Sequence, residues 1–271
     1  MEYRTLGRTG LRVGEIGMGT YRTFDVSGRA AAAHCAQIAA EALGRGLNFF
    51  DTAPMYGEAE DVLGRALEAR RGEALIATKV LERDAASARA SIERSLKLLR
   101  TDTIDLLQIH NMAGWRRVTP VMQEFQREGR VRFIGITDYR PSNFPEMMEA
   151  MRTGLYDTVQ IPYHLGEREC RRALLPLARE MDLGVIVMTP IQPIFSRSSL
   201  TAALSRADLA FLAPYGVRTP GQALLKCLLS DPAVSTLIPA TGKVERVAEN
   251  AAVSDGKPLP PEAMERLERL I

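Results

Sequence analysis

Short apolar runs recur along this chain, and helical patterns separate them. Most of the runs are nearly continuous rather than alternating, which is typical of strands buried on both faces. Between them, apolar positions recur at three- and four-residue spacing, which predicts amphipathic helices; examples are 31–43, 58–69, 86–99, 118–128 and 168–180. The candidate strands are eight in number: 15–20, 47–52, 74–79, 104–110, 132–137, 157–162, 184–190 and 235–240.

Repeated alternation of strand and helix predicts parallel βα units. In a chain of 271 residues, eight such units favour a closed (β/α)8, or TIM, barrel. The main alternative is an open doubly wound sheet, which would normally carry a G-x-G-x-x-G loop after its first strand. Here that position reads GMGTYRT (17–23) and lacks the third glycine.

No linker or low-complexity tract interrupts the pattern, so we expect one domain over residues 1–271. The first residues, YRTLGRTGLRVG (3–14), predict a hairpin around the glycines at 7 and 10. We expect this hairpin to close the bottom of the barrel.

Composition narrows the possible functions. A net charge of +2, from 35 basic and 33 acidic residues, argues against a dedicated nucleic-acid or membrane-surface protein. No apolar stretch is long enough to span a bilayer, and the first residues lack the apolar core of a signal peptide. Three scattered cysteines, at 35, 170 and 227, predict reduced thiols in a cytoplasmic protein and no metal site.

Polar residues end several of the predicted strands. Asp51 ends the second, Lys79 the third and His110 the fourth, and Tyr56 lies in the loop after Asp51. In a TIM barrel, catalytic residues come from the C-terminal ends of neighbouring strands. Lys79 is the most telling of the four, because it follows the apolar run ALIAT in a chain with only five lysines.

Together the four residues predict general acid chemistry. A lysine ammonium should lower the pKa of the Tyr56 hydroxyl from its ordinary value near 10, and Asp51 is the natural counter-ion of a buried Lys79. A neutral His110 can donate a hydrogen bond to a carbonyl oxygen. Each residue also has a structural interpretation when it is taken alone: Asp51 as a turn or N-cap residue, Tyr56 as a packing aromatic and His110 as a hydrogen-bonded core residue.

Three segments carry a resemblance to a known family. DTAPMYG (51–57), ATK (77–79) and LLQIH (106–110) resemble the signature segments of the aldo-keto reductases. The resemblance implies a TIM barrel that binds NADPH without a Rossmann fold. It also implies a catalytic tetrad of Asp51, Tyr56, Lys79 and His110, with Tyr56 as the general acid.

The same resemblance implies the cofactor contacts. Three positions depart from the family pattern: Thr137-Asp138 replaces Ser-Asn, Met188 replaces a nicotinamide-stacking tyrosine, and Ala240 replaces a lysine. Arg246 can still bind the 2′-phosphate, because its planar guanidinium suits phosphate geometry, so NADPH is the expected cofactor, with NADH use possible. The expected cofactor-binding residues are Gly19, Thr20, Asp51, Thr137, Asp138, Gln160, Met188, Thr189, Pro190, Thr241, Lys243, Arg246, Glu249 and Asn250.

The substrate is expected to be a small carbonyl compound that contacts Tyr21 and Trp115. The segment 192–220 is expected to cover the cofactor pyrophosphate, and the short segment after 256 predicts an open, permissive pocket. We expect a monomer or a weak oligomer.

Three functions remain open on sequence alone. The first is an NADPH-dependent carbonyl reductase. The second is an NADPH-binding, redox-sensing regulatory module with slow turnover. The third is an isomerase or aldolase that forms a Schiff base on Lys79.

Overall fold

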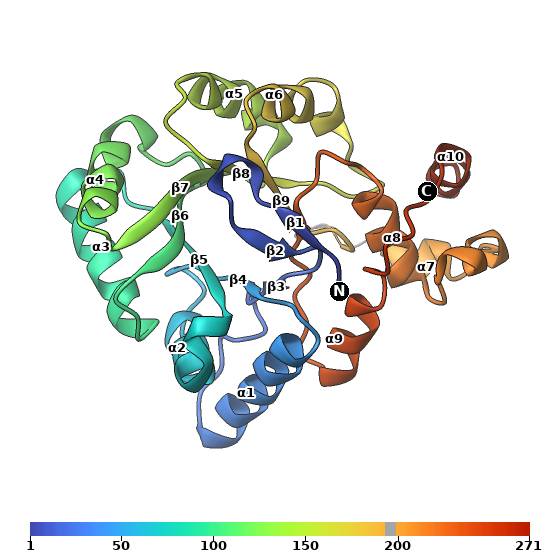
Figure 1. The fold of residues 1–271 in the computed structure, drawn as a ribbon, viewed down its shortest axis with the longest axis horizontal. Helices are drawn as coiled ribbons and strands as arrows, with labels where there is room; N and C mark the ends of the chain where they lie inside the picture. The colour runs from blue at the N-terminus through green and yellow to red at the C-terminus, as the bar shows by residue number, and fades with distance from the viewer. Residues whose placement is uncertain (193–198) are drawn as a thin grey trace.

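The computed structural model describes residues 1–192 and 199–271, so residues 193–198 of the segment expected over the pyrophosphate lie outside the described residues. In the described part, eight parallel strands form one sheet in chain order, with helices packed around it (Figure 1). This confirms the (β/α)8 barrel. The strands are β3 (Met18–Gly19), β4 (Phe49–Asp51), β5 (Leu75–Val80), β6 (Ile104–His110), β7 (Val131–Thr137), β8 (Thr158–Pro162), β9 (Gly184–Met188) and β10 (Thr236–Leu237).

The helices lie outside the strands, and most of them cover the outer faces of the strands (Figure 1). Among the described residues, none of these helices combines the length and the apolar character that a membrane crossing requires. They are α1 (Arg29–Gly44), α2 (Ala59–Leu67), α3 (Ala85–Leu98), α4 (Trp115–Arg127), α5 (Phe144–Arg152), α6 (Leu174–Glu180), α7 (Leu200–Leu204), α8 (Pro220–Leu229), α9 (Val244–Ala251) and α10 (Pro261–Glu268). Of these, α7 and α10 pack beyond α8 (Figure 1).

The seam between the first and last strands closes the barrel with few contacts. Parallel bridges join Ile16 to Leu237 and Gly19 to Ala240. The strand expected over 15–20 is shorter in the structure, where regular pairing covers only Met18–Gly19. Gly19 allows the two strands to approach this closely, because a Cβ at this position would lie only 2.8 Å from the carbonyl oxygen of Ile238.

The helix expected over 168–180 is also interrupted. A 3-10 turn at Glu169–Arg171 precedes α6, which begins at Leu174. Pro176 explains the break, because proline lacks an N–H and clashes with the carbonyl four residues earlier. Proline is best tolerated in the first turn of a helix, so α6 begins shortly before Pro176.

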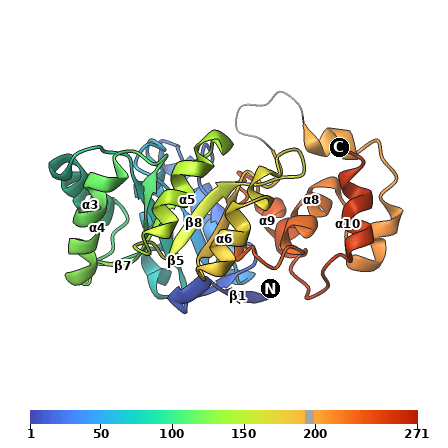
Figure 2. The ribbon, with the colours of Figure 1, turned by 90° about the horizontal axis from the view of Figure 1, so that it is seen from above.

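An antiparallel hairpin of β1 (Tyr3–Thr5) and β2 (Arg12–Gly14) lies across the bottom of the barrel (Figure 2). Leu6, Leu11 and Val13 of this hairpin are buried in one cluster with residues of the barrel interior, including Phe49 and Leu106. The hairpin thus plugs the barrel, as expected. Gly184 permits the close approach, because a Cβ there would lie 2.6 Å from Leu6 side-chain atoms.

Alternation along the strands divides the barrel interior into an apolar lower part and a polar upper part. On β6, Leu106 belongs to the apolar cluster at the hairpin, whereas Gln108 and His110 follow at every second position above it. The register places His110 beside Thr137 and Thr137 beside Gln160 on successive strands. Polar side chains from neighbouring strands therefore meet at the C-terminal end of the barrel.

Candidate active site

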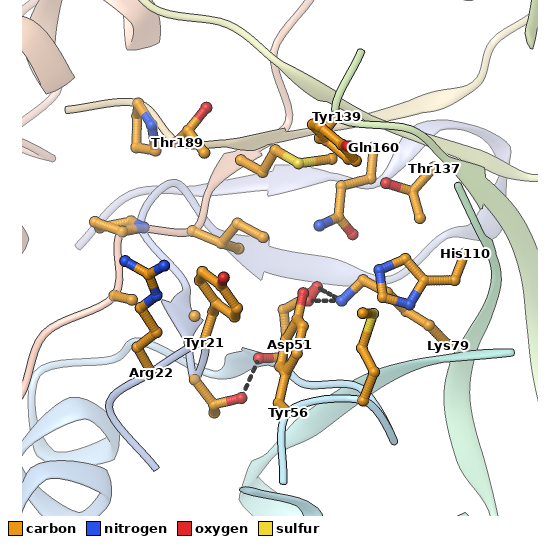
Figure 3. Close-up of a pocket in the computed structure, with 18 of the residues that line it drawn as sticks. Tyr21, Arg22, Asp51, Tyr56, Lys79, His110, Thr137, Tyr139, Gln160 and Thr189 are labelled. Atoms are coloured by element: carbon orange, nitrogen blue, oxygen red, sulfur yellow. Dashed lines mark hydrogen bonds and ion pairs between the residues drawn. The ribbon is translucent and has the colours of Figure 1, made fainter. Parts of the chain in front are cut away.

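A cavity of about 400 Å³ opens at the C-terminal ends of the strands. Its volume lies in the range of small-molecule sites. Most of the residues predicted for the site line it, and Figure 3 shows the central ones pointing toward one another. The predicted residues in its wall are Gly19, Thr20, Tyr21, Asp51, Tyr56, Lys79, His110, Thr137, Gln160, Met188, Thr189 and Pro190.

The centre of the site is a buried ion pair between Asp51 on β4 and Lys79 on β5. The Lys79 side chain is 1% exposed, and its ammonium donates to both Asp51 oxygens, with Oδ1 at 2.7 Å, and to the carbonyl of Thr52 at 2.8 Å. Burial by itself would lower the pKa of Lys79, but Asp51 and Tyr56 raise it above the ordinary value. Lys79 is therefore an ammonium at neutral pH.

Tyr56 lies against this pair. The Lys79 Nζ is 5.1 Å from the centre of the Tyr56 ring, and the ring of His110 approaches it edge-on at 6.1 Å between centroids. Burial raises the pKa of the Tyr56 hydroxyl, and the charge of Lys79 offsets this only in part. Lys79 does lower the pKa of Tyr56, as expected, but the pKa still lies above its ordinary value, because the loss of hydration in the pocket outweighs the attraction of the ammonium.

The loop that carries Tyr56 is held at both ends. The Tyr56 N–H donates to the carbonyl of Ala53 at 3.0 Å, and the Glu58 N–H donates to Asp25 Oδ1 at 3.1 Å. Glu60, in the first turn of α2, is 1% exposed and accepts a hydrogen bond from the Thr78 hydroxyl at 2.6 Å. This bond ties α2 to the strand that carries Lys79.

His110 is neutral in this environment. Burial, followed by the charge of Lys79, lowers its pKa to about 3. Its Nδ1 is buried and has no hydrogen-bond partner in the described part of the chain. Nε2 is thus the ring nitrogen that can reach a molecule in the cavity, and a neutral imidazole can donate to an oxygen there.

On the opposite wall, Thr137 and Gln160 supply polar groups suited to a carboxamide. Thr137 lines the cavity, and its hydroxyl has no hydrogen-bond partner among the described residues. Gln160 is 2% exposed and lines the same cavity. A hydroxyl and a primary amide side by side can satisfy both the N–H and the oxygen of a nicotinamide carboxamide, so this wall fits that group. Met188 lies beside them in the wall.

Asp138 does not line the cavity. It is fully buried and accepts hydrogen bonds from the Arg140 backbone N–H at 2.9 Å, the Arg140 guanidinium at 2.8 and 2.9 Å, and the Asn143 amide at 2.7 Å. Asp138, expected to contact the cofactor, therefore lies outside the cavity wall. The carboxylate turns into its own loop because four donors satisfy it there, and the next residue, Tyr139, lines the cavity instead.

Trp115, expected as a substrate contact, also lies outside the cavity. Its ring is 6% exposed, its Nε1 donates to Glu146 Oε1 on α5 at 3.0 Å, and it contacts Tyr156 edge-on. Because Trp115 is the first residue of α4, it packs between α4 and α5. The position is a structural one.

The residues predicted for the adenosine end lie around α9, outside the cavity wall. Glu249 accepts from the Thr219 hydroxyl and pairs with Arg246, whose side chain is 53% exposed. The first turn of α9 carries no side-chain cap, and its free N–H groups favour an anion. Thr241 and Lys243 directly precede α9 and Arg246 lies in its first turn, where a phosphate would be favoured, whereas Glu249 and Asn250 lie in its last turn.

The cavity wall also contains residues that were not predicted. Four of them directly follow predicted positions: Arg22 comes after Tyr21, Asn111 after His110, Tyr139 after Asp138 and Ile191 after Pro190. Adjacency to a predicted residue is therefore the sequence signal that could have identified them. Among the described residues, the additional lining residues are Arg22, Met55, Asn111, Tyr139, Ile191, Gln192, Ile238, Pro239 and Ala240.

The chain matches the family model described as "Aldo/keto reductase family" over residues 15–271. It is 32% identical over 209 residues to an L-galactose dehydrogenase of Arabidopsis thaliana, an alignment that covers 70% of this chain and 66% of that protein. It is 34% identical over 207 residues to the aldo-keto reductase YhdN of Bacillus subtilis (strain 168), with coverage of 69% and 61%. The chain thus spans less than two thirds of the length of these two relatives.

A solved structure matches over almost its whole length. An aldo/keto reductase from Klebsiella pneumoniae, crystallised in complex with NADP and acetate, superposes with a TM-score of 0.84 at 27% sequence identity. The match covers 100% of this chain and 95% of that chain.

Removing the counter-ion should destabilise the fold. In Asp51→Ala the ammonium of Lys79 stays buried without its counter-ion and keeps only the Thr52 carbonyl, so we expect a loss of about 3–5 kcal/mol in the free energy of unfolding. Glu41→Ala breaks a half-exposed pair with Arg45 and should cost less than about 1 kcal/mol. Urea unfolding measures both, and equal small losses would contradict the proposed cost of the unpaired ammonium. Asp51→Leu combined with Lys79→Met should recover most of the loss.

The depressed pKa of His110 should make stability fall with acid. Between its ordinary value of 6.5 and about 3, the unfolded chain binds a proton that the folded chain does not. The free energy of unfolding therefore decreases as pH falls through this range. From pH 7 to pH 4.5 the wild type should lose about 2–3 kcal/mol more than His110→Gln, which has no such proton to bind. Denaturation curves at both pH values test this, and parallel losses would refute it.

Proposed function

The chain belongs to the aldo/keto reductase family, and we propose that it is an NADPH-dependent oxidoreductase that reduces the carbonyl group of an aldehyde or ketone to an alcohol. The observation that carries the proposal is the buried Asp51–Lys79 pair, placed beside Tyr56 and His110 at one cavity. A solved relative that is crystallised with NADP supports the cofactor assignment.

In this proposal, Tyr56 is the general acid. Its raised pKa keeps the hydroxyl protonated at neutral pH, so the proton is available for a carbonyl oxygen that gains negative charge. The ammonium of Lys79 stabilises the phenolate that remains after the proton is given up, and Asp51 keeps that ammonium in place. His110 donates from Nε2 to the same oxygen and orients the carbonyl.

NADPH, when bound, supplies the hydride. Thr137 and Gln160 would hold the carboxamide of its nicotinamide. Asp51 and the main chain at Gly19 and Thr20 would lie beside it. Met188, Thr189 and Pro190 would form the wall that packs on the ring, where a thioether can replace an aromatic contact. Thr241, Lys243, Arg246, Glu249 and Asn250 would bind the adenosine end, with Arg246 and Lys243 as the cations for the 2′-phosphate.

The substrate side of the cavity is mostly apolar. Tyr21, Met55 and Tyr139 lie in its wall, and Met55 is 53% exposed. We propose a small carbonyl compound that carries an apolar group against these side chains. The rings of Tyr21 and Tyr56 lie 5.0 Å apart, which supports Tyr21 as a substrate contact next to the acid.

The alternatives are less well supported. A Schiff base on Lys79 requires a neutral amine, but Lys79 is held as an ammonium by Asp51, and its pKa is raised. A redox-sensing module with slow turnover would share the cofactor site. Measuring the oxidation of NADPH and NADH in the presence of a panel of aldehydes, ketones and imines would distinguish this module from a reductase. Turnover with none of these substrates would favour the module.

Loss of the acid should abolish turnover and leave the cofactor site intact. Tyr56→Phe removes only the hydroxyl, so we expect kcat to fall by roughly 10²–10⁴-fold with an unchanged Kd for NADPH. Tyr3→Phe, at a hydroxyl that bonds Gly46 on the opposite end of the barrel, should behave as wild type. Steady-state kinetics and cofactor titration measure the two effects. Near-normal turnover of Tyr56→Phe would exclude the mechanism.

The choice between the two cofactors should depend on Arg246. A charge-assisted hydrogen bond contributes about 1.5–3 kcal/mol, so Arg246→Gln should raise the KM for NADPH by roughly 10-fold or more and leave that for NADH unchanged. Arg172→Gln is the control, because that side chain is 80% exposed, pairs only with Glu169 among the ion pairs of the described residues and does not line the cavity. If both cofactors weakened equally, Arg246 would not bind the 2′-phosphate.

A further inference from the structure

Gln108 is an unexpected residue in the barrel interior. It lies in the middle of β6, between the apolar Leu106 and the site residue His110, and it is fully buried. An amide removed from water costs free energy unless it is hydrogen-bonded, so apolar residues would normally fill this layer. Gln108 has none of the roles proposed above for the residues of the site.

The contact that Gln108 makes is specific. Its Nε2 donates to Gln160 Oε1 at 2.7 Å, and both side chains are buried, whereas the Gln108 Oε1 is buried without a hydrogen-bond partner among the described residues. The neighbouring position on β7 is Gly135, which leaves the room that this contact needs. A Cβ there would lie 3.3 Å from Gln108 Cγ and 2.2 Å from the Thr158 hydroxyl. The barrel thus accommodates an amide pair at this level.

In this contact the Gln160 amide accepts through Oε1, which leaves its NH₂ group for the site. Because Oε1 accepts from Gln108, the NH₂ group is turned toward the other side, where Asp51 lies (Figure 3). A carboxylate only accepts hydrogen bonds, so this orientation is the favourable one. It also agrees with the electrostatics of Asp51: burial raises its pKa, and Lys79 and the Gln160 hydrogen bond oppose that rise.

We propose that Gln108 is a positioning residue that fixes the amide orientation of Gln160, so that Gln160 presents its NH₂ group to Asp51 and to an oxygen acceptor in the cavity. Without Gln108, the Gln160 amide can rotate and present its oxygen, which repels both the carboxylate and a carboxamide oxygen. This inference rests on the proposed function, because the acceptor in question is the carboxamide of the nicotinamide cofactor.

A purely structural role makes a different prediction. If Gln108 only fills space, an apolar side chain of similar length should be tolerated without any effect on cofactor binding. Replacing a buried amide by an apolar group is often neutral or stabilising. Stability and cofactor affinity therefore separate the two roles.

The experiment measures the Kd of NADPH by fluorescence titration in Gln108→Met, Gln160→Met and the double variant, together with the midpoint of thermal unfolding. Gln108→Met should raise Kd by about 5- to 10-fold, the effect of one net hydrogen bond, without lowering the midpoint. The double variant should bind no more weakly than Gln160→Met, because Gln108 acts only through Gln160.

Thr158→Val is the matched control. Thr158 adjoins Gly135 in the same layer, and its buried hydroxyl has no hydrogen-bond partner among the described residues. The variant removes a buried polar atom without touching the amide pair, so its Kd should equal that of the wild type. Gln108→Glu adds a second measurement. Its carboxyl can donate to Gln160 Oε1 only when protonated, so its Kd should approach the wild-type value at low pH and rise with pH, whereas that of Gln108→Met should not recover.

Two outcomes overturn the proposal: an unchanged Kd in Gln108→Met, or effects of Gln108→Met and Gln160→Met that add in full. A wild type that binds no NADPH would overturn the proposed function, and this inference with it. The two failures are therefore distinguishable from the wild-type titration alone.

Discussion

The buried ion pair between Asp51 and Lys79 is the interaction on which the rest of the site depends. Removing two charges from water costs several kcal/mol for each, and a single pair recovers this only with good geometry and further hydrogen bonds. The barrel provides both, because Lys79 contacts both carboxylate oxygens and the Thr52 carbonyl. A core built for stability alone would place apolar side chains here. The pair is thus the clearest sign in this structure that the upper half of the barrel is organised for chemistry.

The properties of the neighbouring groups follow from this pair and from burial. The ammonium lowers the pKa of His110, in addition to the effect of burial, and keeps the imidazole neutral. It also moderates the rise that burial causes in the pKa of Tyr56. The result is a protonated phenol and a neutral imidazole at one cavity, which is the combination that can supply a proton and a hydrogen bond to one oxygen. Gln160, held by Gln108, extends the same network to the opposite wall.

Much of this arrangement could be predicted because a parallel barrel makes the ends of neighbouring strands converge. Asp51, Lys79 and His110 end successive strands, so their meeting follows from topology. Asp138 and Trp115 show where this reasoning stops. Both follow strand ends, yet the donors of Arg140 and Asn143 turn Asp138 into its loop, and the start of α4 turns Trp115 toward α5. The orientation of a loop side chain depends on its local hydrogen-bond and packing partners, and these cannot be predicted from the position of the strand end.

The amino-acid sequence by itself determined the order and type of the elements, the closed barrel with its plugged bottom, and the four residues at the centre of the site. These depend on periodicity and on strand ends, which are local properties of the chain. Only the tertiary structure decided the raised pKa of Tyr56, the contact between Gln108 and Gln160, and the residues of the cavity wall such as Tyr139. Each of these depends on how completely water is excluded and on which side chains from distant segments meet, and both are properties of the packed molecule.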